Sequence, residues 1–224
     1  MTPATAGRPS GAGPIPRIVR MHPTLTLEIA AAAARLVVEE GLEYGPAKRR
    51  AARDLGRGAS RSVNMPDNGA VEDAVREYLS VFCADTQPLE LAALRTVAAL
   101  WMARLAEFRP HLTGAVWRGT ATRLSAVHLQ LYCDDGKSAE LALIHQGVDY
   151  DVGSVNGPRH QPVDVLSLAQ RCDALGEPVT VFLTILDHDD LRGALKPDAQ
   201  GRTQRGDLAG LQRLMTDKTD KDTP

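Results

Sequence analysis

The chain has 224 residues, of which 43% are hydrophobic, enough apolar material for one large domain or two small ones with a real core. Its cysteines, Cys83, Cys133 and Cys172, are far apart and show no CxxC or Cys/His spacing, so neither a disulfide framework nor a zinc site is indicated. The longest apolar runs are too short for a membrane span, and the N-terminus lacks a signal-peptide core. We therefore expect a cytoplasmic protein with no membrane partner.

The charge is distributed unevenly along the chain. The net charge is −2, yet residues 1–61 hold 10 Lys/Arg against 5 Asp/Glu. The densest basic cluster is Lys48, Arg49, Arg50 and Arg53, which suits a nucleic-acid or acidic protein partner. The alternative interpretation is a solvated helix face.

The N-terminal half has helical periodicity. Residues 1–22 are rich in Pro, Gly and Arg without apolar periodicity, so we expect a disordered arm there. Residues 23–112 form a predicted helical region, because apolar residues recur at helical spacing between Gly, Pro and Asp boundary signals. The four helices are expected over 24–40, 46–55, 68–85 and 88–109.

Beyond Pro110 the sequence is typical of an α/β domain, predicted over 113–215. The short apolar run Ala115–Trp117 and the alternating pattern of 127–131 predict strands. Further strands are expected at 148–152, 163–168 and 179–186, with a loop over 153–162. Helices are expected over 136–145 and before a disordered tail, 216–224. The predicted fold class is therefore α+β, a helical region followed by a mixed sheet flanked by helices.

Two local motifs are interpreted as structural. Gly136-Lys137-Ser138 stands where a P-loop lysine would stand, but the position that needs the first glycine is Leu131. The run Asp187 to Asp190 follows a strand, and consecutive side chains point in different directions, so we interpret it as a helix cap and not as a metal cluster.

The stretch from Gly114 to Leu131 resembles the signature of the nucleotidyltransferase superfamily, the polymerase-beta-like fold, and especially its minimal nucleotidyltransferase branch. That signature is Gly-Ser or a close variant after a strand, followed by acid, apolar residue, acid on the next strand. Gly119-Thr120 would take the place of Gly-Ser, and Ala126-Val127-His128 the place of the acids. Only residues 121–125 separate the two, fewer than most members of the superfamily have. The whole chain also resembles a bacterial subgroup with such a domain, in whose relatives we expect Asp-Ile-Asp at 126–128.

The resemblance implies a nucleoside triphosphate held with Mg²⁺ by carboxylates. Ala126 offers no ligand, and the imidazole of His128 suits zinc, copper or nickel better than Mg²⁺. We therefore expect a nucleotide-binding or regulatory pseudoenzyme whose metal-dependent transfer is lost or weakened. The resemblance implies nucleotide contacts at Gly119, Thr120, Ser125 and His128. Two basic residues of a later loop, Arg192 and Lys196, are also expected to contact the nucleotide.

Two other hypotheses follow from the residues. In the first, the chain is an active Mg²⁺-dependent nucleotidyltransferase that recruits substitute acids, with Asp164 as the catalytic candidate beside Asp134 or Asp135. In the second, it is a nucleic-acid or protein adaptor acting through the basic helix at 46–55. Similar chains are sometimes labelled UDP-N-acetylmuramate alanine ligases, but such a ligase needs an ATP-binding P-loop and a much longer, multi-domain chain.

Overall fold

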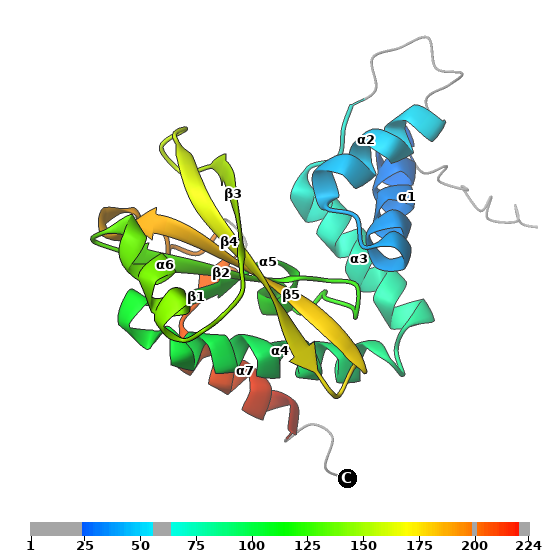
Figure 1. Cartoon of the computed structure of the whole chain (residues 1–224). Helices are drawn as coiled ribbons and strands as arrows, with labels where there is room; N and C mark the ends of the chain where they lie inside the picture. Colours follow the sequence, from blue (N-terminus) through cyan, green and yellow to red (C-terminus); the bar gives the residue numbers. More distant parts are fainter. Residues whose placement is uncertain (1–23, 56–63, 199–200, 220–224) are drawn as a thin grey trace, which may run out of the picture.

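The computed structural model describes residues 24–55, 64–198 and 201–219, so the predicted N-terminal arm and residues 220–224 lie outside the described residues (Figure 1). A helical region and a six-stranded sheet with flanking helices make up the fold, which confirms the α+β class. None of the described helices combines the length and the apolar character that crossing a bilayer requires.

The helical region contains α1 (Leu25–Glu40), α2 (Tyr44–Leu55) and α3 (Asn68–Phe82). Gly41 ends α1 because its φ of 68° is a conformation that glycine adopts without steric cost. Asp67 caps α3, since its side chain accepts a hydrogen bond from the Ala70 amide. Both boundaries were predicted. The three helices bury a hydrophobic cluster of their own, which includes Ile29 and Val71.

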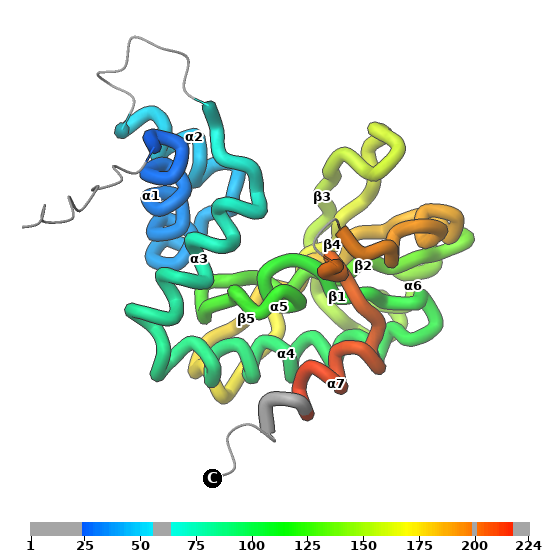
Figure 2. The backbone as a smooth tube through the Cα atoms, turned by 180° about the vertical axis from the view of Figure 1, so that it is seen from behind, coloured from blue at the N-terminus to red at the C-terminus, as the bar shows by residue number. Residues whose placement is uncertain are grey.

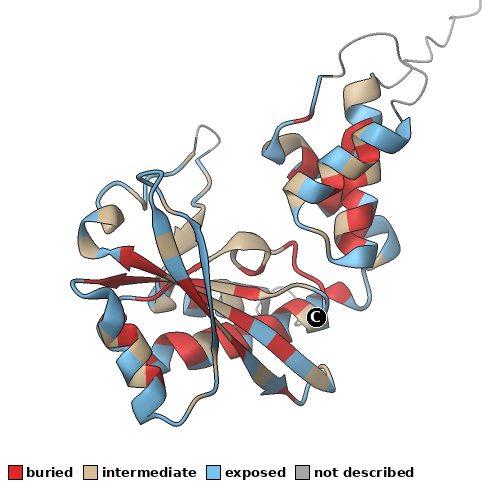
Figure 3. Cartoon of the chain, turned by 45° about the horizontal axis from the view of Figure 1, so that its top comes forward, coloured by how far each residue is buried: buried red, intermediate tan, exposed pale blue. Residues whose placement is uncertain are grey.

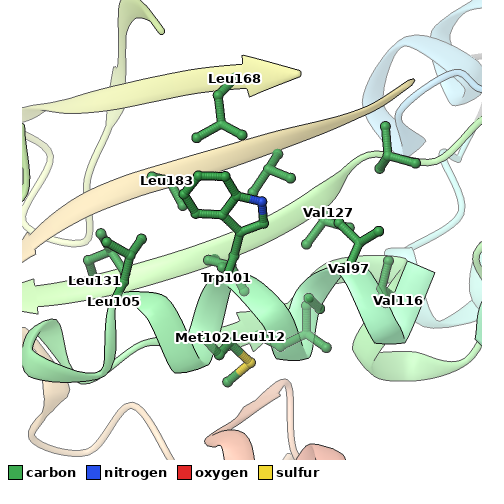
Figure 4. Close-up of a cluster of buried hydrophobic side chains, with 14 of the residues drawn as sticks. Val97, Trp101, Met102, Leu105, Leu112, Val116, Val127, Leu131, Leu168 and Leu183 are labelled. Carbon is green, nitrogen blue, oxygen red and sulfur yellow. The ribbon is translucent and has the colours of Figure 1, made fainter. Parts of the chain in front are cut away.

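The helix α4 (Gln87–Arg104), followed by the short 3-10 helix η2 (Ala106–Phe108), runs along one face of the sheet. Its predicted apolar stripe is buried: Leu94, Val97, Trp101, Leu105 and Phe108. Figure 4 shows Trp101 directed from α4 toward Leu168 and Leu183 of the sheet. The last helix, α7 (Leu208–Thr219), packs along α4 in both views of the chain (Figures 1 and 2). The predicted disorder of residues 216–219 is therefore wrong, because α7 continues through them.

The sheet has the strand order β3-β4-β5-β2-β1-β6. Only β2 and β5 pair in parallel; the other neighbours are antiparallel. Its strands are β1 (His111–Thr113), β2 (Val127–Cys133), β3 (Asp151–Asn156), β4 (Pro162–Cys172), β5 (Glu177–Asp187) and β6 (Arg205–Gly206). The helices between them are α5 (Gly114–Arg118), α6 (Gly136–His145) and the 3-10 helix η3 (His188–Leu191). The helix predicted over 136–145 is confirmed as α6, and the Asp187 side chain caps η3 as expected.

Two predicted elements differ in the structure. The strand predicted for Ala115–Trp117 is wrong, because this run forms the single turn of α5 between two left-handed glycines, Gly114 and Gly119. The loop predicted over 153–162 is also wrong in its first part, because β3 extends to Asn156 and forms a hairpin with β4. Likewise β1 begins at His111, two residues before the predicted start of the α/β domain.

The two faces of the sheet have different environments. Val127, Leu129 and Leu131 on β2 are fully buried in the hydrophobic cluster that α4 and α6 share. Because successive side chains of a strand point to opposite faces, His128 and Gln130 lie on the other face, where both are only half-buried. Figure 3 shows the buried residues of the sheet domain and those of the helical region as two separate groups. The half-buried face of the sheet is the candidate for function.

Candidate functional site

A glycine turn connects β1 to α5 at the edge of this half-buried face. Gly114 has a φ of 74°, and a Cβ atom added there would lie 3.6 Å from Cδ2 of His128 on β2. Gly119, by contrast, ends α5, and its carbonyl accepts a hydrogen bond of 3.2 Å from Nε2 of Gln87 on α4. The glycine that directly follows a strand and touches β2 is therefore Gly114. This corrects the expected order of strand, Gly119-Thr120 turn and strand.

The other two predicted residues of this stretch build the connection between α5 and β2. Thr120 is only 3% exposed, and its amide donates to the Ala115 carbonyl. The hydroxyl of Ser125 accepts a hydrogen bond of 3.0 Å from the Thr122 amide. Their observed contacts are thus within the loop, and a role of either residue in nucleotide binding stays a prediction.

His128 lies against an aromatic ring that sequence reasoning did not single out. In the parallel pairing of β2 with β5, His128 is the register partner of Phe182. Their rings are stacked, with centroids 5.1 Å apart and planes 21° from parallel. Both side chains are half-buried, so the stacked pair remains partly open to solvent.

Two charged groups flank His128. The carboxylate oxygen Oε1 of Glu43, from the turn between α1 and α2, lies 3.7 Å from His128 Nε2. Burial of the imidazole lowers the pKa of His128 below its usual 6.5, and the nearby Arg118 guanidinium lowers it further, whereas Glu43 opposes this shift. The imidazole is therefore neutral near pH 7 and does not offer a cation to a phosphate.

Hydrogen bonds hold the polar groups next to the stacked pair. Arg205 on β6 donates from Nη1 to Oε1 of Gln130 at 2.7 Å and to the hydroxyl of Tyr132 at 3.1 Å. The Tyr132 hydroxyl in turn donates to Gln130 Oε1 at 3.1 Å. This network fixes Gln130 beside His128, two positions along the same face of β2.

Asp164, the predicted catalytic acid, is remote from His128. It shares the face of β4 that carries Leu166 and Leu168, which belongs to the cluster under α4 and α6. Its Oδ2 lies 3.9 Å from Nζ of Lys137 on α6. The strand registers put Asp164 two strands away from β2 and three residues farther along, a separation of about 14 Å at the spacings usual in a sheet. The structure therefore does not bring Asp164 to the face of His128.

The remaining predicted basic residues also lie outside the stacked pair's surroundings. Arg192 and Lys196 are exposed in the segment that follows η3. In the basic helix, Lys48 Nζ donates to the Pro66 carbonyl and to Asn68, and Arg50 pairs with Glu40. Arg49 and Arg53 are exposed, with Arg53 4.0 Å from Asp54.

The donor groups near His128 do not suit Mg²⁺. They are one imidazole and one exposed carboxylate, Glu43, whereas Mg²⁺ requires near-octahedral oxygen coordination. Across residues 24–55, 64–198 and 201–219, no three His, Cys, Asp or Glu side chains converge as metal ligands. The face offers a stacking surface with amide, hydroxyl and carboxylate groups around it.

Comparison with known proteins found no matching family model, no matching curated protein and no matching solved structure.

Proposed function

We propose that this chain is a nucleotidyltransferase-like protein that binds a nucleotide on the half-buried face of its sheet without metal-dependent transfer. The observation that carries the proposal is the stacked pair of His128 and Phe182 at partnered positions of two parallel strands. A nucleobase stacks on such a surface whatever its identity, and base stacking on an aromatic side chain contributes about 1–3 kcal/mol per base.

Two further observations support this proposal. The order of β1, a left-handed glycine, α5 and β2 fits the resemblance better with Gly114-Ala115 in the Gly-Ser place, because ten residues, 116–125, then precede Ala126. His128 stacks on Phe182, which suits a planar ligand, and Glu43 is the single carboxylate paired with it among the described residues, fewer oxygen ligands than a divalent cation requires. A regulatory or carrier role needs no acid at 126 or 128.

Calorimetric titration with each of the four nucleoside triphosphates, in Mg²⁺ and in EDTA, tests the proposal. We expect at least one to bind with the same affinity in both buffers. Phe182→Ala should weaken that binding about 5- to 150-fold, the equivalent of a lost stack. The matched control is Phe82→Ala, which removes an exposed phenyl ring from α3 and should leave the affinity unchanged.

Absence of binding by all four nucleotides would refute the proposal. Binding that requires Mg²⁺, together with transfer that Asp164→Asn abolishes, would instead establish the active enzyme with substitute acids. The adaptor hypothesis has less support, because Lys48 and Arg50 are engaged within the chain.

A further inference from the structure

A second cluster of charged groups lies where the helical region meets the sheet domain. At its centre is Glu72 of α3, whose side chain is only 8% exposed. Its Oε1 lies 2.7 Å from Nη2 of Arg76 and 4.0 Å from Nη1 of Arg202, and its Oε2 lies 3.0 Å from Nε of Arg118. Three guanidinium groups therefore surround one carboxylate. A single carboxylate offers too few lone pairs to engage all three in bidentate pairs.

The three arginines come from separate parts of the chain. Arg76 is on α3, Arg118 ends α5, and Arg202 precedes β6. They line a cleft of about 210 Å³ together with Glu72, Trp117, Thr203, Gln204 and Leu214. The Nε atoms of Arg118 and Arg202 are buried there and make no well-aligned hydrogen bond, although each lies near a carboxylate, at 3.0 Å from Glu72 and 3.5 Å from Asp198. An oxyanion that takes the place of Glu72 could give these buried donors better-aligned acceptors.

Two further acidic side chains lie near the three arginines, both beside Arg202. Arg202 Nη1 lies 3.6 Å from Asp73, and its Nε lies 3.5 Å from Asp198. These distances exceed those of charge-assisted hydrogen bonds. Glu72 is thus the carboxylate that the guanidinium groups bind most closely, and it belongs to the helical region, whereas Arg118 and Arg202 belong to the sheet domain.

Polar contacts contribute to the attachment of the helical region, beside the packing of Gly41 on Leu124 and the short connection from α3 to α4. Its hydrophobic cluster and the cluster of the sheet domain share no side chain among the described residues. The contacts across the junction include Glu72 with Arg118, the Arg76 bond to the Arg118 carbonyl at 2.7 Å, and Glu43 with His128. Polar interfaces between domains allow relative motion unless they are large and hydrophobic. Loss of the Glu72 contacts would therefore loosen the helical region.

We propose that Arg76, Arg118 and Arg202 form a binding site for a phosphate-bearing anion, and that Glu72 occupies this site as an internal competitor. A polyphosphate carries more charge and more acceptor oxygens than one carboxylate, and guanidinium groups bind phosphate oxygens in pairs. When the anion enters, Glu72 leaves the guanidinium groups and the helical region separates from the sheet domain. Glu43 and Tyr44 are consecutive, and they contact His128 and Arg118 respectively, so this site adjoins the stacked pair.

The ligand class deepens the proposed function, since a nucleotide carries such an anion, but the test is independent of it. The probe is inorganic tripolyphosphate, which has no base to stack, titrated calorimetrically into wild type, Glu72→Gln and Glu77→Gln. Glu77 is an exposed carboxylate of the same helix and serves as the matched control. We expect Glu72→Gln to bind at least ten-fold more tightly than wild type, Glu77→Gln to bind within two-fold of it, and the double variant Glu72→Gln, Arg118→Gln to lose the gain.

Small-angle scattering provides the second readout. Saturating tripolyphosphate should raise the radius of gyration of wild type, and Glu72→Gln should be expanded before the anion is added. Equal affinity of Glu72→Gln and wild type, or a gain that survives Arg118→Gln, would overturn the proposal. If Glu72→Gln does not fold, Arg202→Gln in the wild-type background decides: it should weaken binding at least five-fold, whereas the exposed control Arg213→Gln should not.

Titrations with a nucleotide and with its nucleoside distinguish this inference from the function proposed above. If tripolyphosphate behaves as expected but Phe182→Ala leaves nucleotide affinity unchanged, the anion site stands and the stacking proposal fails. If Phe182→Ala weakens the binding of both nucleotide and nucleoside while Glu72→Gln leaves the affinity for tripolyphosphate unchanged, the stacking proposal stands and the anion site fails.

Discussion

Replacing Trp101 with phenylalanine tests the packing of α4 against the sheet, on which the position of the candidate face depends. Trp101 is 2% exposed, and its Nε1 donates a hydrogen bond of 3.0 Å to Oε1 of Gln170 on β4. The Arg104 guanidinium lies 4.3 Å from the centre of the indole ring. Phenylalanine keeps one aromatic ring and therefore keeps part of the packing and of this cation–π contact.

The expected loss of stability has three parts. The hydrogen bond contributes about 1 kcal/mol net, and its loss costs little more because Gln170 is half-buried and its Oε1 can accept a hydrogen bond from water instead. The smaller side chain leaves a void of about 40 Å³, which costs about 1 kcal/mol at the usual dependence on cavity volume. The apolar surface that is no longer buried adds about 1 kcal/mol. Trp101→Phe should thus lower the free energy of unfolding by about 3 kcal/mol.

Urea denaturation followed by circular dichroism measures this loss. A double-mutant cycle with Gln170→Leu isolates the hydrogen bond, because Trp101→Phe should cost about 1 kcal/mol less when the acceptor is already gone. A total loss below about 1 kcal/mol, or a cycle with no coupling between the two residues, would mean that Trp101 does not join α4 to β4 as described.

The remaining predictions concern the candidate face itself. Gly114→Ala should lower the free energy of unfolding by about 1–2 kcal/mol because φ is positive at this position. The control Gly45→Ala, in the first turn of α2, should not destabilise the chain. Equal thermal midpoints for the two variants would contradict this prediction. An NMR titration should give His128 a pKa below 6.5, and Glu43→Gln should lower that pKa further by removing the charge that opposes the shift. Since the pKa of His128 is then lower in the folded state than in the unfolded state, the unfolded state binds more protons between the two values. The free energy of unfolding should therefore fall as the pH drops below 6.5 toward the folded pKa. A measured pKa at or above 6.5 would be inconsistent with the burial of the ring.

Local patterns in the sequence were sufficient for most helices and for the fold class. The stripe that includes Leu94 and Trp101 repeats at helical spacing over the length of α4, so its buried face could be predicted. The helix α5 could not be predicted, because a single turn of apolar residues has no period that distinguishes a helix from a strand. The left-handed backbone of Gly114 and Gly119 bounds α5, and the presence of a glycine in the sequence does not specify its φ.

The candidate site depends on contacts between distant parts of the chain. Phe182 stacks on His128 only because β5 lies between β4 and β2, and no local pattern specifies that strand order. Glu72 likewise follows Val71 in an ordinary amphipathic helix, and nothing near it in the sequence identifies Arg118 or Arg202 as partners. The resemblance drew attention to His128, but no local pattern specified which residues would surround it.

The side chain at position 128 determines the charge that faces Glu43 of the helical region. An aspartate at 128 would place a second carboxylate on the side of the sheet that faces Glu43, but its shorter side chain would end farther from Glu43 than the 3.7 Å that separates Glu43 from the imidazole. Because the Glu43 side chain is 79% exposed, the two like charges would repel by no more than about 1 kcal/mol. A neutral imidazole has no such repulsion with Glu43. Replacing His128 with aspartate would therefore weaken the contact between the helical region and the sheet without building a Mg²⁺ site, because Ala126 supplies no oxygen ligand.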